Sequence, residues 1–384
     1  MTDMIGPIKP FSSIAVEEKI AVTYAMSHPL SGYLAGKERG GDAVVALEDA
    51  WAKEFRVKHA IACNSATSGL LAAAFAIGLK PGDRFACPAM TMSATCAAPM
   101  FTGAKPFFID VDDETFDMED HDLPYDAPVF VTNLFGHPAR LHSLRRWCDL
   151  NHTVLIEDNS QSPFAWEHGK FAGTIGHIGV FSLNIHKPLQ CGEGGIIVTD
   201  DDHLAARLRA FINHGEHVSG EIGLNLRMPE VCAAIALVQL QRGEEIVQGR
   251  IDQATAILAA IGDIPGLRLP IVRDRCRHVY YTIPFMFEMR VGTADSNVNV
   301  FHVDAKRRAA FCAALRDQGV PIVEGYVDPL YRLPAFAKWA RPCPVAEDLH
   351  DRRLFYFENC QHDVTLEQAE QIGAAFRRAA EMVL

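Results

Sequence analysis

Several features of extracellular, nucleic-acid-binding and membrane-spanning proteins are missing from this sequence. Its ten cysteines stand far apart, with no C-x-x-C pair, so reduced thiols in the cytosol are the simpler interpretation. The formal net charge is −12 and no long basic run occurs, which argues against nucleic acid as the main partner because phosphate binding needs clustered Lys and Arg. A local cationic pocket for an anionic small molecule remains allowed.

Targeting and metal motifs are scarce as well. The start, MTDMIGPIKPFSS, lacks the basic and then apolar build of a secretory signal, and no apolar run approaches the ~18 residues that span a bilayer. We therefore expect a cytoplasmic protein without a membrane segment. HExxH, G-x-G-x-x-G and Walker lysine motifs are absent, so the sequence gives no sign of the commonest zinc, dinucleotide and P-loop binding sites. No metal site is expected.

The 384 residues, 49% of them hydrophobic, predict a packed globular protein with one large domain and a smaller companion. From about 40 to 250, helical patterns such as 42–55 and 68–79 alternate with short apolar runs at 60–63, 84–89, 106–111, 129–135 and 153–158. This alternation is typical of an α/β domain with a largely parallel sheet. After Arg250 helices and strands follow a different pattern, so we predict a large domain at 1–250 and a small α+β domain at 251–384.

Two stretches carry polar residues directly after predicted strands. In TVLIEDNSQS, Asp158 ends an apolar run, and acids at the carboxyl edge of a strand often face a ligand, although a capping or turn aspartate explains it more simply. In CNSATSGL, a strand stops and a helix begins. Free N–H groups there, with the hydroxyls of Ser65 and Thr67, could cradle a phosphate, and plain N-capping explains the stretch about as well.

A third stretch, FSLNIHKPLQCGEGG, holds Lys187 between a strand and a glycine turn. A single lysine is usually a solvated surface residue. Lysine, carboxylate and phosphate cradle together are nevertheless the three protein parts that a pyridoxal phosphate site requires: the amine can form a Schiff base, and the acid can hold the pyridinium nitrogen protonated.

The order of these segments resembles that of the DegT/DnrJ/StrS family of nucleotide-sugar aminotransferases, which are fold type I pyridoxal-phosphate enzymes. The similarity covers almost the whole chain and includes CNSATSGL, IEDNSQS, GTIGHIGVFSLNIHK, GEGGIIVTDD, GLNLRM and GYVDPLYRLPAF. It implies a large domain with a mostly parallel seven-stranded sheet, as in aspartate aminotransferase, and a smaller C-terminal α+β domain.

The resemblance also implies roles for single residues. It makes Lys187 the Schiff-base lysine and proton shuttle, Asp158 the pyridinium partner and Gln161 the contact to the phenolic oxygen of the cofactor. It implies that Ser182 binds the phosphate together with the Ser65 cradle. The remaining implied cofactor contacts are Ala66 and Thr67 at the phosphate, Met92 at the ring, and Asn225, which reaches the phosphate from the neighbouring subunit of an obligate homodimer.

Three departures from the family pattern stand out. Met92 replaces the usual aromatic side chain stacked on the cofactor ring, and a methionine can lie against a π face through its sulfur. Ala66 replaces a common glycine, so φ is negative there or strain is carried. The segment FYFENCQHDVT at 355–365 replaces a short Leu-Pro segment, so substrate contacts there cannot be transferred.

Some relatives are dehydratases in which a histidine replaces the lysine. Here the spacing assigns that position to Lys187 and not to His186, whose side chain we expect on the opposite face of the strand end. His214, Arg227, Glu230 and Tyr326 lie in family-like segments and could line the substrate site, although a structural ion pair explains Arg227 more simply; none of the four is assigned a catalytic role.

The sequence therefore predicts an aminotransferase that moves an amino group from an amino acid, glutamate or glutamine, to a keto-sugar, most simply a nucleotide-linked one, or to a keto-cyclitol. A pyridoxal-phosphate dehydratase and a catalytically silent regulatory protein of the same fold remain alternatives.

Overall fold

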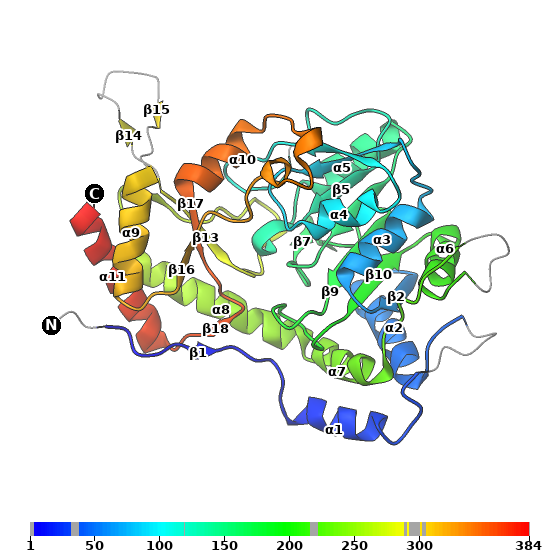
Figure 1. Cartoon of the computed structure of the whole chain (residues 1–384). Coiled ribbons are helices and arrows are strands. Elements are labelled where there is room, and N and C mark those ends of the chain that lie inside the picture. The colour runs from blue at the N-terminus through cyan, green and yellow to red at the C-terminus, as the bar shows by residue number, and fades with distance from the viewer. Residues whose placement is uncertain are drawn as a thin grey trace.

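The computed structural model describes residues 4–31, 38–118, 120–215, 222–287, 290–291, 300–301 and 305–383. A seven-stranded sheet forms its centre (Figure 1). In spatial order the strands are β2 (His59–Cys63), β10 (Gly195–Thr199), β9 (Ile178–Ser182), β6 (Leu155–Asp158), β5 (Val129–Thr132), β3 (Arg84–Pro88) and β4 (Lys105–Ile109). β10 is antiparallel to both neighbours, and the ladders from β9 to β4 are parallel. The predicted mostly parallel sheet is confirmed.

Both faces of this sheet are buried, which explains the nearly continuous apolar strand sequences. Successive residues of β10 show the alternation: Ile197 belongs to one hydrophobic cluster, whereas Ile196 and Val198 belong to the other. The first cluster includes residues of α3 (Ala66–Ala76), α4 (Ala94–Met100) and α6 (Asp202–Ile212). The second includes residues of α2 (Asp42–Phe55), α5 (Leu141–Leu150) and α7 (Glu230–Gln241). Helices therefore cover the sheet on both sides.

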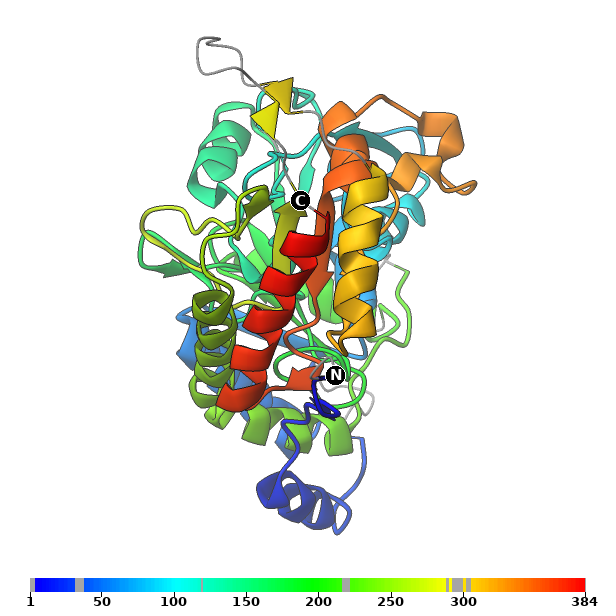
Figure 2. The ribbon, with the colours of Figure 1, turned by 90° about the vertical axis from the view of Figure 1, so that its left-hand side faces the viewer.

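The C-terminal part has its own sheet and its own core. Its antiparallel sheet has the order β11 (Leu267–Arg268), β13 (Ile283–Phe287), β17 (Leu354–Phe357), β16 (Ile322–Glu324). The helices beside it are α8 (Gly243–Ile261), α9 (Ala305–Asp317) and α11 (Leu366–Val383), with the short α10 (Pro344–Asp348) nearby. Figure 2 shows α11 lying along α9. Phe285, Phe311, Phe355 and Phe376 form the centre of this separate core.

Two features cross the predicted division between residues 250 and 251. The helix α8 runs through it without a break. The N-terminal segment lies along the C-terminal part: β1 (Lys9–Pro10) pairs with β18 (His362–Asp363), and the Ile5 side chain is buried in the C-terminal core. The next helix, α1 (Val16–Ala25), packs against α7. The two-domain division itself stays a prediction.

Among the residues that the structure describes, no helix combines the length and the apolar character needed to cross a bilayer.

Candidate active site

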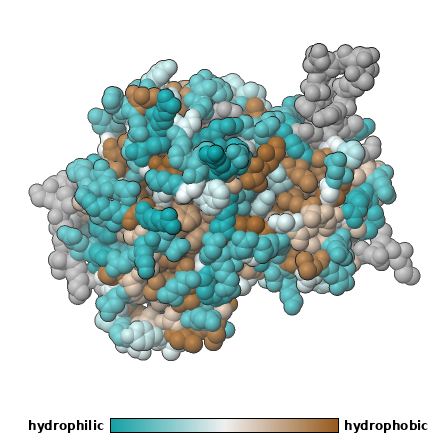
Figure 3. Space-filling model, turned by 180° about the vertical axis from the view of Figure 1, so that it is seen from behind, coloured by the Kyte–Doolittle hydropathy of each residue, from teal (hydrophilic) through white to brown (hydrophobic). Residues whose placement is uncertain are grey.

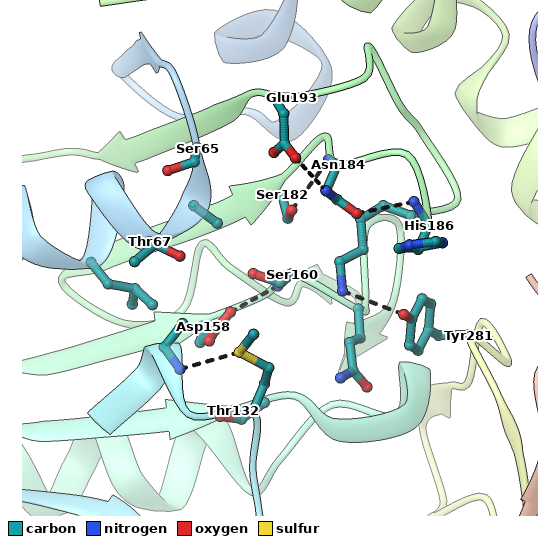
Figure 4. A pocket seen from close by; sticks show the side chains of 16 residues that line it. Ser65, Thr67, Thr132, Asp158, Ser160, Ser182, Asn184, His186, Glu193 and Tyr281 are labelled. Carbon is teal, nitrogen blue, oxygen red and sulfur yellow. Dashed lines mark hydrogen bonds between the residues drawn. The ribbon is translucent and has the colours of Figure 1, made fainter. Parts of the chain in front are cut away.

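The carboxyl ends of the parallel strands open into a cavity of about 390 Å³ (Figure 4). This is the edge where open α/β sheets bind ligands. Eight of the nine residues predicted to contact the cofactor line the cavity, namely Lys187, Asp158, Gln161, Ser182, Ser65, Ala66, Thr67 and Met92. The other residues of the lining are Leu70, Ala94, Thr132, Ser160, Asn184, His186, Glu193 and Tyr281.

Asp158 is the last residue of β6, and its side chain is 4% exposed. One carboxylate oxygen, Oδ1, accepts a hydrogen bond from the Ser160 backbone N–H at 3.1 Å. The other, Oδ2, accepts one from the Thr95 hydroxyl at 2.6 Å. The predicted role of a turn aspartate therefore applies to Oδ1 only. Oδ2 is held by a residue of α4, and the carboxylate borders the cavity.

The start of α3 forms one end of the cavity. Ser65 caps the helix, because its hydroxyl accepts a hydrogen bond from the Ser68 N–H at 3.1 Å. The first turn of a helix also leaves N–H groups without intrahelical acceptors, and its dipole favours an anion. Capping and an anion-binding site are thus compatible here. Ala66 lies in the helix and has no positive φ, so the position carries no backbone strain.

Close packing fixes this helix start against the sheet. A Cβ added to Gly195 of β10 would lie 2.6 Å from the Ser65 carbonyl carbon and 2.7 Å from the Ala66 nitrogen. Glycine is the residue that allows this approach. Ser182, at the end of β9, adds a hydroxyl to the same cavity and accepts a hydrogen bond from the Asn184 N–H at 3.3 Å.

Lys187 follows β9 in a turn, and its side chain lines the cavity. Its Nζ lies 3.5 Å from the Tyr281 hydroxyl and 4.6 Å from the centre of the Tyr281 ring. Burial lowers the pKa of Lys187 below the usual lysine value, and the negative charge of Asp158 partly opposes this shift. A lysine with a lowered pKa is more often in the neutral, nucleophilic form.

Gln161 is buried with both ends of its amide bonded. Its Oε1 accepts a hydrogen bond from the Phe135 N–H at 2.7 Å, and its Nε2 donates to the Tyr326 hydroxyl at 3.0 Å. These contacts fix the orientation of the amide at the cavity wall. Tyr326 thereby supports Gln161.

Asn225 is the one predicted contact that does not line this cavity. Its side chain is exposed, and its backbone forms an antiparallel bridge with Asn213. Its role toward a neighbouring subunit stays a prediction. Met92 does line the cavity: it is 52% exposed, and its sulfur accepts a hydrogen bond from the Ala94 N–H at 3.2 Å.

The expectation for His186 was wrong. β9 ends at Ser182, so the alternation of strand side chains does not extend to residue 186, and His186 lines the same cavity as Lys187. Two of the family-like residues, Arg227 and Glu230, have contacts elsewhere. Arg227 donates a hydrogen bond to Asn213 Oδ1 at 2.7 Å. Glu230 accepts hydrogen bonds from the Gly41 and Ala43 N–H groups at the start of α2.

The sequence analysis missed Thr95 and Tyr281. Thr95 lies in α4, three residues after Met92, but a buried threonine in a helix gives no sign in the sequence that it reaches an aspartate 63 positions away. Tyr281 lies in an apolar stretch, VYYTIPF, that predicts a strand. The structure gives β13 at Ile283–Phe287, with Tyr281 in the bend before it.

Comparison with solved structures defines the class of fold. An aminotransferase from Psychrobacter cryohalolentis superimposes with a TM-score of 0.83 at 24% identity, over 98% of this chain and 100% of that one. The protein therefore has the fold of this aminotransferase.

Sequence comparison gives the family. The model of the DegT/DnrJ/EryC1/StrS aminotransferase family matches residues 34–377. The chain is similar to the GDP-perosamine synthase of Caulobacter vibrioides, with 31% identity over 66% of this chain and 70% of that protein. It is also similar to that of Escherichia coli O157:H7, with 27% identity over 80% and 83%. The chain belongs to the DegT/DnrJ/EryC1/StrS aminotransferase family, and it is a pyridoxal-phosphate-dependent enzyme.

The described residues fit that cofactor. The cavity offers a helix start and the Ser182 hydroxyl for a phosphate, a buried carboxylate in Asp158 for a ring nitrogen, and a primary amine in Lys187 for an aldehyde. These groups come from β6, β9, the turn after β9 and the start of α3, and all border the same space.

Proposed function

We propose that this aminotransferase transfers an amino group from an amino acid, glutamate or glutamine, to a keto-sugar, most simply a nucleotide-linked one, or to a keto-cyclitol. The observation that carries the proposal is the presence of Lys187, Asp158 and the α3 start on one cavity. The substrate class is supported by relatives whose names place them in amino-sugar synthesis, the GDP-perosamine synthases.

In this proposal the residues around Lys187 bind the cofactor. When bound, pyridoxal phosphate supplies a conjugated ring that accepts electrons from the reacting carbon of the substrate. Asp158 would hold a proton on the ring nitrogen through its charge, and Gln161 would contact the phenolic oxygen. Ser65, Ala66, Thr67 and Ser182 bind the phosphate.

Lys187 is the catalytic residue of the proposal. Its amine would anchor the cofactor covalently and, when free, would move a proton between the reacting carbon atoms. The lowered pKa of its ammonium supports this task, because a base must lose its proton near the working pH. Met92 contacts the ring face through its sulfur.

The proposal also includes a cytoplasmic homodimer with shared sites. All ten cysteines are free in the structure, which suits a reducing compartment.

Asn225 is exposed, as a residue that contacts the cofactor of a neighbouring subunit would be in a single protomer. On α1 the apolar side chains Val16, Ile20 and Tyr24 are 59%, 64% and 70% exposed. This helix projects at the lower end of the molecule, where brown patches reach the surface in Figure 3. A second copy of the chain would cover them.

The experiment that tests the site compares wild type with Lys187→Ala and the control Lys170→Ala, which changes an exposed lysine on β8 (Lys170–Phe171). After addition of pyridoxal phosphate and borohydride, peptide mapping should find the pyridoxyl group at position 187 in wild type and control and nowhere in Lys187→Ala. Labelling of another lysine in wild type would reject the assignment.

The same samples separate the alternatives. A transaminase yields an amine-bearing sugar only when an amino-acid donor is present, whereas a dehydratase yields a deoxy product without one. A regulatory protein would bind the cofactor and turn over neither substrate. The dehydratase is not favoured, because both of the named relatives are perosamine synthases and a lysine occupies position 187.

A further inference from the structure

The aromatic ring of Tyr281 forms a cation–π contact with the ammonium of Lys187. The Nζ atom lies 4.6 Å from the ring centre, inside the distance of about 6 Å at which a cation is attracted to an aromatic face. The hydroxyl is 3.5 Å from Nζ, which makes that hydrogen bond long and weak. The ring face, more than the hydroxyl, is therefore the main contact.

This contact acts against the burial of the lysine. Burial lowers the pKa of Lys187, and the charged or titratable groups that face it are few. They are Asp158 of β6 and the Cys360 thiol, with His186 and Glu193 on the cavity wall. Burial also raises the pKa of Tyr281, so its phenol stays neutral and cannot serve as a counter-ion. Tyr281 can attract the Lys187 ammonium only through the partial negative charge on the face of its ring.

The backbone around Tyr281 is held from the large sheet. After β5 the chain turns at Leu134–Gly136, where Phe135 O accepts a hydrogen bond from the Thr282 N–H at 3.2 Å and Gly136 O accepts one from Val279 N–H at 2.8 Å. A Cβ on Gly136 would lie 2.7 Å from the Tyr281 nitrogen. The two segments are therefore in direct contact.

The same backbone is held from the other side by the segment in which this chain departs from its family. Asn359 Nδ2 donates to the Tyr280 carbonyl at 2.8 Å, and the Cys360 N–H donates to the Tyr281 carbonyl at 3.1 Å. Asn359 is fully buried, and its Oδ1 accepts from Gln253 of α8 at 2.8 Å. Tyr280 adopts a left-handed φ of 49° in this bend. Contacts from both sides thus fix the direction of the Tyr281 side chain.

We propose that Tyr281 is a positioning residue whose ring holds the free Lys187 ammonium in the cavity, and that the 355–365 segment positions this ring. The inference rests on the proposed function, in which Lys187 is the reactive amine. It assigns Tyr281 no proton transfer of its own.

The test separates the ring from the hydroxyl with two substitutions. Tyr281→Phe keeps the ring face, and Tyr281→Leu removes it. The pH profile of acetylation at Lys187, measured by peptide mass spectrometry in the full-length protein before cofactor is added, gives the pKa of the amine. Tyr280→Leu is the matched control, since this neighbouring ring stacks on His278 instead.

We expect Tyr281→Leu to lower the pKa of Lys187 by about 0.5–1.5 units, because the contact that favours the charged form is lost. Tyr281→Phe and Tyr280→Leu should keep the wild-type profile. An unchanged profile in Tyr281→Leu, or an equal shift in Tyr281→Phe, would overturn the inference. Tyr281→Met replaces the leucine variant if circular dichroism shows that the latter does not fold.

Failure of the proposed function has a different signature. If pyridoxal phosphate does not attach to Lys187 in wild type, the role of Lys187 in catalysis is rejected, whatever the acetylation profiles show. Attachment at Lys187 together with identical profiles in all variants would reject only the role of Tyr281.

Discussion

The hydrogen bond from Thr95 to Asp158 offers the sharpest test of how the site is held. Both side chains are buried, Thr95 at 0% and Asp158 at 4% exposure, and the oxygen atoms lie 2.6 Å apart. The substitution Thr95→Val keeps the shape of the side chain and removes only the hydroxyl. The carboxylate then loses the hydrogen-bond partner on its buried side.

The magnitude follows from the contacts that remain. Hydrogen bonds to charged groups contribute about 1.5–3 kcal/mol. The hydroxyls of Thr91 and Thr132, which lie 3.1 and 3.4 Å from that of Thr95, are 2.8 Å from each other, so they stay paired and add little. We expect a loss of about 1.5–3 kcal/mol in the free energy of unfolding, or a fall of roughly 2–4 °C in Tm at this chain length.

Thermal unfolding of the cofactor-free protein measures this loss, and titration with pyridoxal phosphate measures its effect on binding. Because the unsupported carboxylate can turn away from the cavity, the dissociation constant should rise about tenfold to a hundredfold. Thr255→Val is the matched control: it removes an exposed hydroxyl that donates to the Ile251 carbonyl on α8.

Two results would refute this reasoning. A Thr95→Val protein as stable as the control would mean that the 2.6 Å contact contributes nothing to folding. A stability loss with unchanged affinity for pyridoxal phosphate would mean that Asp158 is a structural residue and does not contact the cofactor.

Two further predictions concern packing and pH. Gly195→Ala should weaken binding of pyridoxal phosphate by more than about tenfold, because its Cβ would press on the backbone of Ser65 and Ala66 and move the anion site; Gly249→Ala, with nothing within 4 Å, should instead stabilise α8 by up to about 1 kcal/mol. Burial lowers the pKa of His278 well below its usual value. The unfolded chain therefore binds more protons than the folded one, and stability falls as the pH drops below about 6.5. Urea unfolding at pH 5.5 and 7.5 should show a difference in the free energy of unfolding, and His278→Gln should reduce that difference by about 1.4 kcal/mol.

Much of the central sheet and of the helices that cover it could be predicted from the sequence. Its strands are continuous apolar runs because helices cover both faces of the sheet, and the predicted runs at 60–63, 84–89 and 153–158 correspond to β2, β3 and β6. The path of the N-terminal segment could not be predicted. The pairing of Lys9–Pro10 with His362–Asp363 joins residues that are about 350 positions apart, and a two-residue strand has no periodicity to detect.

The sequence alone determined which residues can supply the chemistry. Lysine, aspartate, glutamine and hydroxyl side chains follow predicted strands, and the resemblance to the aminotransferase family implied that Lys187, Asp158 and Ser65 share one cofactor site. Only the tertiary structure decided how these groups are held. Thr95, Tyr281 and Asn359 act through contacts between distant segments, and such contacts depend on packing geometry, which leaves no spacing or pattern in the chain.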